Sequence, residues 1–461
     1  MTQIDALQSP ELLLKPELTL IDEVPQTGMG IVVQQGKFTD VGPFNEVLSR
    51  HPNLRVVDLP SRLLMPGFID THNHLTQSYG KALAFGEPSE IFKRIWVPLE
   101  QHLTDEDLQI SAQLSALESL RGGFTTICDA GTRSSAGLEA IETAVSTVGI
   151  RCVLSKICHD LGQSPEQIAT TEAQASKHLS QYTSGGLIHP SLAIAIPEAA
   201  SDSMLHKVAH MCRESGVAFQ VHVNEHVASV ERSLVARGKR PLEVLQHANA
   251  LGPELLAAHV TLATPSELSL LKDQGAAVSY NPVASSWKGN AVAPALQMAT
   301  MGIRMGLGTD GTRGDGFRLL DAAETAQRLT LGMTVADFSV GAGWTWLAMA
   351  SAWGADAAHL GRITGKIAKG MQADFLLIDI DVPELTPSWD LGWELVRLAN
   401  RSQIEAVFVQ GKMRLWQGWP LDWDAKALMQ KAKERAHQTV SVAPIQRIHP
   451  NSATARAMHK N

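Results

Sequence analysis

Short apolar runs alternate with longer amphipathic stretches through the middle of the chain. Between about residues 64 and 330, strand-like runs are separated by segments with apolar residues at helical spacing. The expected strands are residues 64–72, 125–130, 151–156, 191–196, 218–223, 255–259, 277–280 and 303–309, and the clearest expected helices are 105–121, 201–215 and 265–274. Eight strands alternating with helices predict an α/β fold, a (β/α)8 TIM barrel. A doubly wound open sheet is the alternative, but no glycine-rich phosphate loop follows the first expected strand.

The two ends of the chain show a different pattern. Residues 1–63 contain short alternating segments separated by glycine, proline and asparagine turns, and segments 370–380 and 405–409 return to this pattern. We therefore expect a small composite β-sandwich domain built from residues 1–63 and 365–423. The barrel would span residues 64–364. A C-terminal helix and tail would occupy residues 424–461, with the polar end of the tail poorly ordered.

Composition and charge exclude several classes of function. Hydrophobic residues make up 44% and charged residues 19%, which is typical of globular proteins and not of disorder. The formal charge of -8 and the pI near 6.1 provide no basic surface for nucleic acid. No apolar run reaches the roughly 18 residues that span a bilayer. Without a signal-like N-terminus or a C-x-x-C pair, we expect a cytoplasmic protein with four buried free cysteines.

The strongest local signal lies at the end of the first expected strand. Residues 66–74 read Pro-Gly-Phe-Ile-Asp-Thr-His-Asn-His, which places His72 and His74 two positions apart. Residues two apart on a strand point to the same face, so both imidazoles can bind one ion. This is also the end of the strand where TIM barrels build their active sites. The pair alone is weak evidence, because surface loops often carry two histidines.

Other metal-binding residue types occur at the same end of later strands. His222 ends the fifth expected strand, and Glu225 follows it three residues later. His259 ends the sixth expected strand, and Asp310 follows the eighth. Each of them alone could be an ordinary buried polar residue, but their shared position predicts a single site. Imidazole and carboxylate ligands suit zinc or ferrous iron.

These motifs resemble the amidohydrolase superfamily, in the deaminase branch that includes guanine, cytosine and S-adenosylhomocysteine deaminases and the triazine hydrolases. The resemblance spans nearly the whole chain and rests on segments 66–74, 221–225, 258–259, 307–311 and 361–374. It implies one divalent metal ion per chain, with zinc favoured and ferrous iron the alternative, bound by His72, His74, His222 and Asp310. The fourth strand has no lysine that could bridge two metals, which favours a mononuclear site.

The resemblance also implies a reaction. Metal-bound hydroxide would attack an amino-substituted carbon of a small N-heterocycle, such as an oxopurine, pterin, pyrimidine or triazine, and release ammonia. Asp310 would accept the proton of the water, and Glu225 would carry a proton to a ring nitrogen and then to the departing amine. His259 would orient the hydroxide or stabilise the tetrahedral centre. Such relatives are commonly dimers or larger, so we expect a homodimer or higher homo-oligomer.

Positions that would contact the substrate depart from the adenosyl-type deaminases. Glu100 resembles a glutamate that binds ribose in that group, but Glu198 stands where those enzymes carry a histidine, which disfavours an adenosine-like substrate. Gln77 resembles a glutamine that meets a ring amide in oxopurine and pterin deaminases, although a hydrogen bond within the barrel rim explains it equally well. Glu198 could accept hydrogen bonds from an amino-rich ring. Trp96 and Trp287 could stack on such a ring, or simply pack in the core.

Two alternatives remain open. The same barrel and metal could remove chloride or an alkylamine from a triazine, or cleave an amide or urea-like bond. Glu225 favours deamination, because a proton shuttle matters most when the leaving group is an amine. A catalytically silent binding barrel would lack a metal ligand or the shuttle, whereas all five candidate positions are filled in this chain.

Overall fold

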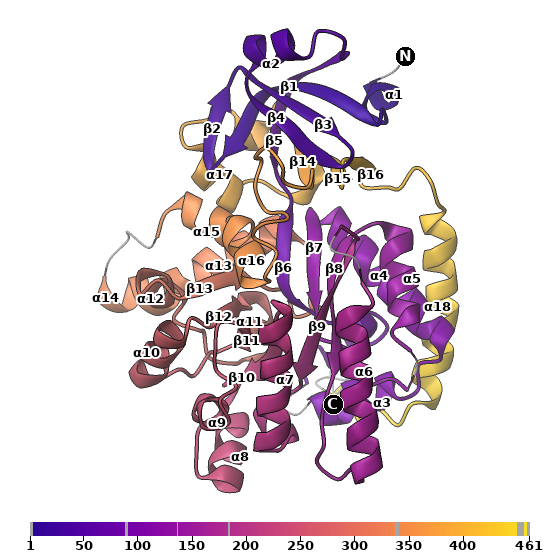
Figure 1. Cartoon of the computed structure of the whole chain (residues 1–461), viewed down its shortest axis with the longest axis vertical. Helices are drawn as coiled ribbons and strands as arrows, with labels where there is room; N and C mark the ends of the chain where they lie inside the picture. The colour runs from indigo at the N-terminus through magenta and orange to yellow at the C-terminus, as the bar shows by residue number, and fades with distance from the viewer. Residues whose placement is uncertain are drawn as a thin grey trace.

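Eight parallel strands form one sheet that curls into a nearly closed barrel at the centre of the molecule (Figure 1). The protein is described by a computed structural model that covers residues 3–87, 91–135, 137–182, 185–336, 341–449 and 456–458. The barrel strands follow chain order: β6 (Phe68–Asn73), β7 (Phe124–Asp129), β8 (Arg151–Ile157), β9 (Ile188–Ile194), β10 (Phe219–Val223), β11 (Leu255–His259), β12 (Ala277–Tyr280) and β13 (Arg304–Leu307). The predicted TIM barrel is confirmed.

Helices cover the outside of the barrel. They are α4 (Asp105–Arg121), α5 (Glu139–Val148), α6 (Pro165–Ser180), α7 (Asp202–Ser215), α8 (Val227–Arg237), α9 (Pro241–His247), α10 (Pro265–Gln274), α11 (Pro282–Lys288), α12 (Ala295–Thr300), α13 (Gly316–Gln327), α14 (Met333–Val335), α15 (Gly343–Met349) and α16 (Ala352–Ala357). Helices α4, α6 and α10 are preceded by the N-cap residues Thr104, Ser164 and Thr264, and each hydroxyl accepts from the backbone N–H three residues later. Such capping boxes fix where a helix begins, which explains why α4 and α10 match their predicted bounds.

The first barrel strand was predicted to start too early. Residues Leu64–Pro66 end strand β5 (Val56–Pro66) of the other sheet, and β6 starts only at Phe68. Gly67 separates the two strands, and a Cβ at this position would lie 2.1 Å from Thr125 Oγ1. The chain therefore passes between the sheets at a residue without a side chain, at the pair Pro66-Gly67 that divides the apolar run.

A second, mixed sheet joins the two ends of the chain. The N-terminal part supplies β1 (Glu11–Ile21), β2 (Val24–Thr27), β3 (Met29–Gln34), β4 (Lys37–Pro43) and β5, and the C-terminal part supplies β14 (Phe375–Asp379), β15 (Ile404–Val409) and β16 (Lys412–Trp416). The strands follow the order β16-β15-β14-β5-β1-β3-β4, with β2 paired to β1. Antiparallel pairing of β14 with β5 confirms a composite β domain, whose strands form one connected sheet. The exact domain boundaries stay predictions.

Shorter elements complete the described chain. Helices α1 (Gln3–Leu7) and α2 (Phe44–Arg50) lie with the mixed sheet, and α17 (Leu391–Arg397) packs on α13 and α15. Single-turn helices include η4 (Pro197–Ala199), η5 (Arg328–Gly332), η6 (Pro383–Leu385) and η7 (Arg401–Gln403). The four cysteines are buried and free, as expected. Within the described ranges, no helix is both long and apolar enough to cross a membrane.

The last helix, α18 (Ala425–Val442), packs along the outside of α4 (Figure 1). Arg435 donates to both carboxylate oxygens of Asp107 at 2.8 Å, which fixes α18 to the first turn of α4. Beyond α18, residues 443–449 lie against the segment that follows β6. Residues 443–449 thus have defined contacts, whereas the expectation of a poorly ordered polar end falls mainly on residues 450–455 and 459–461, which lie outside the described chain.

Candidate metal centre and substrate pocket

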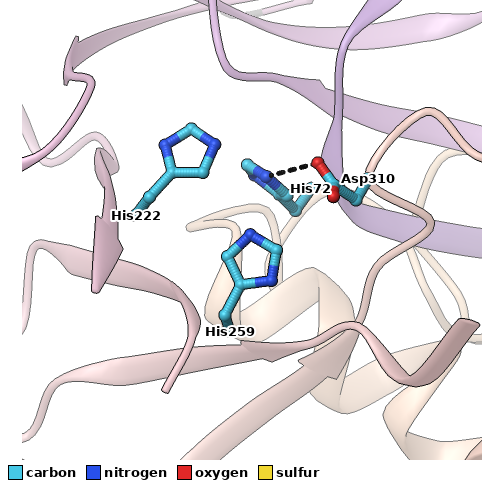
Figure 2. Close-up of side chains that lie close together, drawn as sticks. All are labelled: His72, His222, His259 and Asp310. Carbon is cyan, nitrogen blue, oxygen red and sulfur yellow. Dashed lines mark ion pairs between the residues drawn. The ribbon is translucent and has the colours of Figure 1, made fainter. Parts of the chain in front are cut away.

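The residues proposed as metal ligands converge at the C-terminal ends of the barrel strands. His72, His222, His259 and Asp310 each offer one ligand atom, and these atoms all lie within 4.8 Å of one another. Figure 2 shows the three imidazoles and the carboxylate facing a common centre. His74 completes the group, because its Nε2 lies 3.2 Å from Asp310 Oδ1 and 3.2 Å from His222 Nε2. All four expected ligands therefore lie around one point, together with His259.

Local backbone geometry positions these side chains. His259 and Asp310 adopt the left-handed conformation, with φ of 76° and 53°, which is uncommon for residues other than glycine. The N–H of Asp310 donates to the carbonyl of His72 at 2.8 Å, so the chain after β13 is tied to β6. Buried Asp70 strengthens this junction by accepting from the N–H of Thr309 at 2.9 Å. Unusual backbone conformations cluster at functional sites, where surrounding contacts hold them.

Hydrogen bonds and burial set the state of two histidines. His222 Nδ1 lies 2.8 Å from the carbonyl of Ala195, an acceptor, so Nδ1 carries the proton and the lone pair of Nε2 faces the site. Burial, followed by the neighbouring imidazoles, holds the pKa of His222 well below its usual value. Burial also lowers the pKa of His74. Neutral imidazoles with inward lone pairs are the form that binds a metal.

His259 has the opposite arrangement. The Oδ1 atom of Asn281 accepts from the hydroxyl of Ser279 at 2.9 Å, which turns the amide nitrogen toward His259. Asn281 Nδ2 then donates to His259 Nδ1 at 3.2 Å, so in the neutral ring the proton resides on Nε2. Burial lowers the pKa of His259 to about 4, which favours this neutral ring. His259 thus presents an N–H donor to the site, whereas His222 presents a lone pair.

Three of these imidazoles have a buried nitrogen that makes no hydrogen bond within the described chain. They are His72 Nε2, His74 Nδ1 and His259 Nε2. His72 Nε2 has the Asp310 carboxylate nearby, with Oδ1 at 3.3 Å (Figure 2). Unpaired buried polar atoms are costly and need a partner such as an ion or a water molecule. Three inward nitrogens and one carboxylate form the donor set of a catalytic zinc or ferrous site. The residues present therefore fit a single divalent cation with a water molecule beside it.

Glu225 lies at the edge of this group. Its Oε1 is 3.9 Å from His259 Nε2 and 2.9 Å from the Lys288 ammonium, which also contacts Asp310 Oδ2 at 2.5 Å. Burial would raise the pKa of Glu225, but the charge of Lys288 outweighs it and lowers that pKa. Sequence reasoning missed Lys288 and Asn281. Asn281 follows β12 at the same end as the histidines, which is a usable signal, whereas the position of Lys288 on α11 gives none.

A cavity of about 370 Å³ opens from the candidate metal centre. Its walls include four of the five residues predicted to contact the substrate: Gln77, Trp96, Glu198 and Trp287. One carboxylate oxygen of Glu198 is buried without a hydrogen-bond partner, and burial raises the pKa of this group. The Arg133 guanidinium lies 4.2 Å from the Phe92 ring centroid on another wall. The cavity thus combines aromatic surfaces with an unpaired acceptor and a cation.

Glu100, the fifth predicted contact, lies behind the cavity wall. Its side chain is fully buried and accepts from four donors: Thr76 Oγ1 at 3.3 Å, Gln77 Nε2 at 3.1 Å, and the N and Nη1 atoms of Arg133 at 3.0 and 3.2 Å. A carboxylate only accepts, so Gln77 must turn its NH2 group toward Glu100 and its carbonyl away. Glu100 therefore fixes the orientation of Gln77 and Arg133.

Comparison with known proteins gives concordant matches. The model of the "Amidohydrolase family" matches residues 63–414. A 5-methylthioadenosine/S-adenosylhomocysteine deaminase of Thermodesulfovibrio yellowstonii is 28% identical over 417 residues, covering 89% of this chain and 94% of the relative. A 5'-deoxyadenosine deaminase of Methanosarcina mazei is 29% identical over 419 residues, covering 89% and 93%.

Solved structures share the fold. An adenosine deaminase from Xanthomonas campestris with bound zinc superposes with a TM-score of 0.85 at 22% identity, covering 94% of this chain and 99% of that chain. An atrazine chlorohydrolase from Arthrobacter aurescens, complexed with zinc, superposes with a TM-score of 0.82 at 19% identity, covering 92% and 100%. Both matches extend over the barrel and the composite β domain.

Proposed function

The chain belongs to the amidohydrolase family, and we propose that it is a metal-dependent aminohydrolase that removes an amino group from a small N-heterocycle. The observation that carries this proposal is the convergence of His72, His74, His222 and Asp310, with Glu225 beside them, on one cavity. Relatives that cover about nine-tenths of the chain are named as deaminases. A catalytically silent barrel would not need the metal ligands and a proton-carrying carboxylate to be retained together.

The proposed chemistry divides among the side chains. When bound, a divalent metal supplies hydroxide near neutral pH by lowering the pKa of a water molecule. Both protons of that water are used: Glu225 accepts one and delivers it to a ring nitrogen, and Asp310 accepts the other, which Glu225 afterwards carries to the leaving amine, so that ammonia departs. The Nε2–H of His259 donates to the oxygen that adds to the ring carbon, which stabilises charge as it develops. Lys288 holds the Glu225 carboxylate beside the site through its 2.9 Å contact.

We further propose that the substrate is a free heterocyclic base and not a nucleoside. Its four internal donors leave Glu100 no capacity to bind a ribose, and its carboxylate is sealed from the cavity. The carbonyl of Gln77 and the unpaired oxygen of Glu198 offer two acceptors inside the same cavity. A ring that carries N–H or amino groups on two edges satisfies both acceptors, as in amino-oxopurines, pterins and aminotriazines.

Three finer points are also proposals. Zinc is the favoured ion because the donor set of three imidazoles and a carboxylate suits it, and ferrous iron is the alternative. A homo-oligomer and a cytoplasmic location are expected from the sequence and await measurement. Chloride or alkylamine as leaving group is tested with chloro- and alkylamino-substituted triazines, by measuring release of chloride or alkylamine.

Ammonia release from metal-quantified protein tests the proposed function. Free aminopurines, pterins, aminopyrimidines and aminotriazines should be compared with adenosine, guanosine and cytidine at matched concentrations. We expect ammonia from at least one class of free bases, and at least tenfold lower kcat/KM for the nucleosides, roughly the cost of one poorly accommodated group. Glu198→Gln should raise KM for the best substrate, whereas Glu384→Gln, at an exposed position, should not. Silence across the whole panel from metal-loaded protein would contradict the proposal.

A further inference from the structure

One wall of the cavity is built from short helices. The segment after β6 forms η1 (Leu75–Gln77), η2 (Lys81–Ala84), the π-helical turn η3 (Phe92–Trp96) and α3 (Val97–Glu100). Phe92 and Trp96 from this segment line the cavity, and Trp287 of α11 adjoins them. Elements of one or two turns are only marginally stable by themselves, so this wall depends on what packs behind it.

The end of the chain packs behind this wall. Val440 and Ile445 contact the apolar cluster of Ala84, Ile95, Trp96 and Leu99. Residues 443–449, here named the C-terminal strap, also pair with the wall through the backbone. The N–H of Gln446 donates to the carbonyl of Arg94 at 2.9 Å, and Arg94 Nη1 donates to the carbonyl of Gln446 at 2.9 Å. The strap thus contacts the wall through both apolar and polar groups.

A buried carboxylate fastens the strap. The side chain of Glu87 is fully buried and accepts from Arg94 Nη1 at 2.9 Å and from Arg447 Nε at 3.2 Å. It also accepts from the backbone N–H groups of Ile448 at 3.0 Å and His449 at 3.2 Å. Burial alone would raise the pKa of Glu87, but these donors outweigh it and lower the pKa to about 2. Glu87 is therefore ionised, and donors of this same chain bind both of its carboxylate oxygens.

The strap cannot shift freely at its other end. The helix that leads into it, α18, is held on α4 by the bidentate contact of Arg435 with Asp107. The strap therefore approaches Glu87 from a fixed direction, although the two lie more than 350 residues apart in the sequence. Charge-assisted contacts of this number and geometry are stronger than those of ordinary surface ion pairs.

We propose that the C-terminal strap holds the wall that carries Phe92 and Trp96 in the geometry needed to bind the substrate ring, and that Glu87 and Arg447 are positioning residues for that binding. The identification of the bound molecule as a heterocycle rests on the proposed function, whereas the ordering of residues 91–100 by the strap does not. Loss of the strap should therefore weaken substrate binding while leaving the metal centre and the chemical step in place.

Arg447→Ala tests the strap, because Arg447 is not among the residues that line the cavity. In the full-length, metal-loaded protein we expect hydrogen exchange of the amides in residues 91–100 to become at least about tenfold faster. KM for the best substrate should rise at least about fivefold, with kcat within about twofold of wild type and metal content unchanged. Arg447→Lys, which keeps the charge, should recover part of both effects. Arg362→Ala, at an exposed position outside the strap, should change neither.

Two truncations separate the strap from the residues beyond it. A chain that ends at Ala443 should reproduce the fast exchange and the raised KM, whereas a chain that ends at His449 should resemble wild type. Wild-type exchange and KM in Arg447→Ala, or equal effects of the two truncations, would overturn the proposal. Fast exchange in Arg447→Ala, together with no ammonia release by wild type, would support the strap and refute the deaminase function.

Discussion

Replacing Glu100 by glutamine separates an orienting role from a ribose-binding role. The carboxylate accepts from Thr76, Gln77 and, twice, Arg133, and its side chain has no exposed surface. A glutamine side chain has one acceptor oxygen, and its NH2 group must face at least one of these donors. The amide of Gln77 would then no longer be held with its carbonyl toward the cavity.

The magnitude follows from the contacts that are lost. One neutral hydrogen bond between Gln77 and the substrate contributes about 0.5–1.5 kcal/mol, which corresponds to roughly a two- to tenfold rise in KM. The guanidinium of Arg133 also loses its buried counter-charge, which should lower the free energy of unfolding by about 1–3 kcal/mol. Neither change involves the metal ligands, so metal content should stay at the wild-type level.

Steady-state kinetics on matched free bases and nucleosides, with urea unfolding in parallel, measure these effects. We expect Glu100→Gln to raise KM for the free bases, and Glu384→Gln, exposed and outside the site, to change neither KM nor unfolding. A rise in KM confined to the nucleosides would show that Glu100 binds ribose. Wild-type KM for all substrates would show that Gln77 does not depend on Glu100, and either result would refute the reasoning.

Four further predictions address the site and the fold. Glu225→Gln should lower kcat at least about 10²-fold with normal metal content, and an unaffected kcat would remove its assigned role. His222→Ala should lose the metal, and normal occupancy by elemental analysis would show that the ligand set is wrong. Asp374→Asn breaks the fully buried ion pair with Arg151 and should lower the free energy of unfolding in urea by about 3–5 kcal/mol. Asp422→Asn, in an exposed ion pair, should lower it by less than about 1 kcal/mol, and equal losses would contradict this prediction. Burial lowers the pKa of His189 to about 4, so the unfolded chain binds a proton at this histidine more readily than the folded chain does. The free energy of unfolding should therefore fall by up to about 3 kcal/mol as pH falls from 6.5 toward 4. His189→Gln should flatten that slope, and an unchanged slope would assign it to other groups.

The sequence predicted those parts of the fold that local patterns determine. Strands β11 and β12 and helices α4 and α10 match their predicted bounds, because short apolar runs and capping residues mark them. The start of β6 was missed, because apolar residues on both sides of Pro66-Gly67 suggest one strand, although this pair marks the change from one sheet to the other. The close approach of Gly67 to Thr125 shows why a residue without a side chain is needed at this point.

The sequence predicted some parts of the candidate site better than others. Its ligand-type residues were found because parallel strands bring their C-terminal ends together, so a shared position along each strand becomes proximity in space. The roles of Glu100 and Glu198 were not separable from the sequence, since one faces inward to Arg133 and the other faces the cavity. The strap was missed altogether. Residues 443–449 show no helical or strand periodicity, and their partners, Arg94 and Glu87, lie more than 340 residues earlier in the chain.

Titration of metal-free protein with zinc, followed by ammonia release from the best free base of the panel, tests the central claim most directly. The proposed single-metal deaminase predicts no activity without metal and a linear rise that stops at one zinc per chain. Ammonia release from the metal-free protein, or a requirement for two metals per chain, would contradict the proposed site. A fully loaded protein that releases no ammonia from any amino-heterocycle would contradict the proposed reaction.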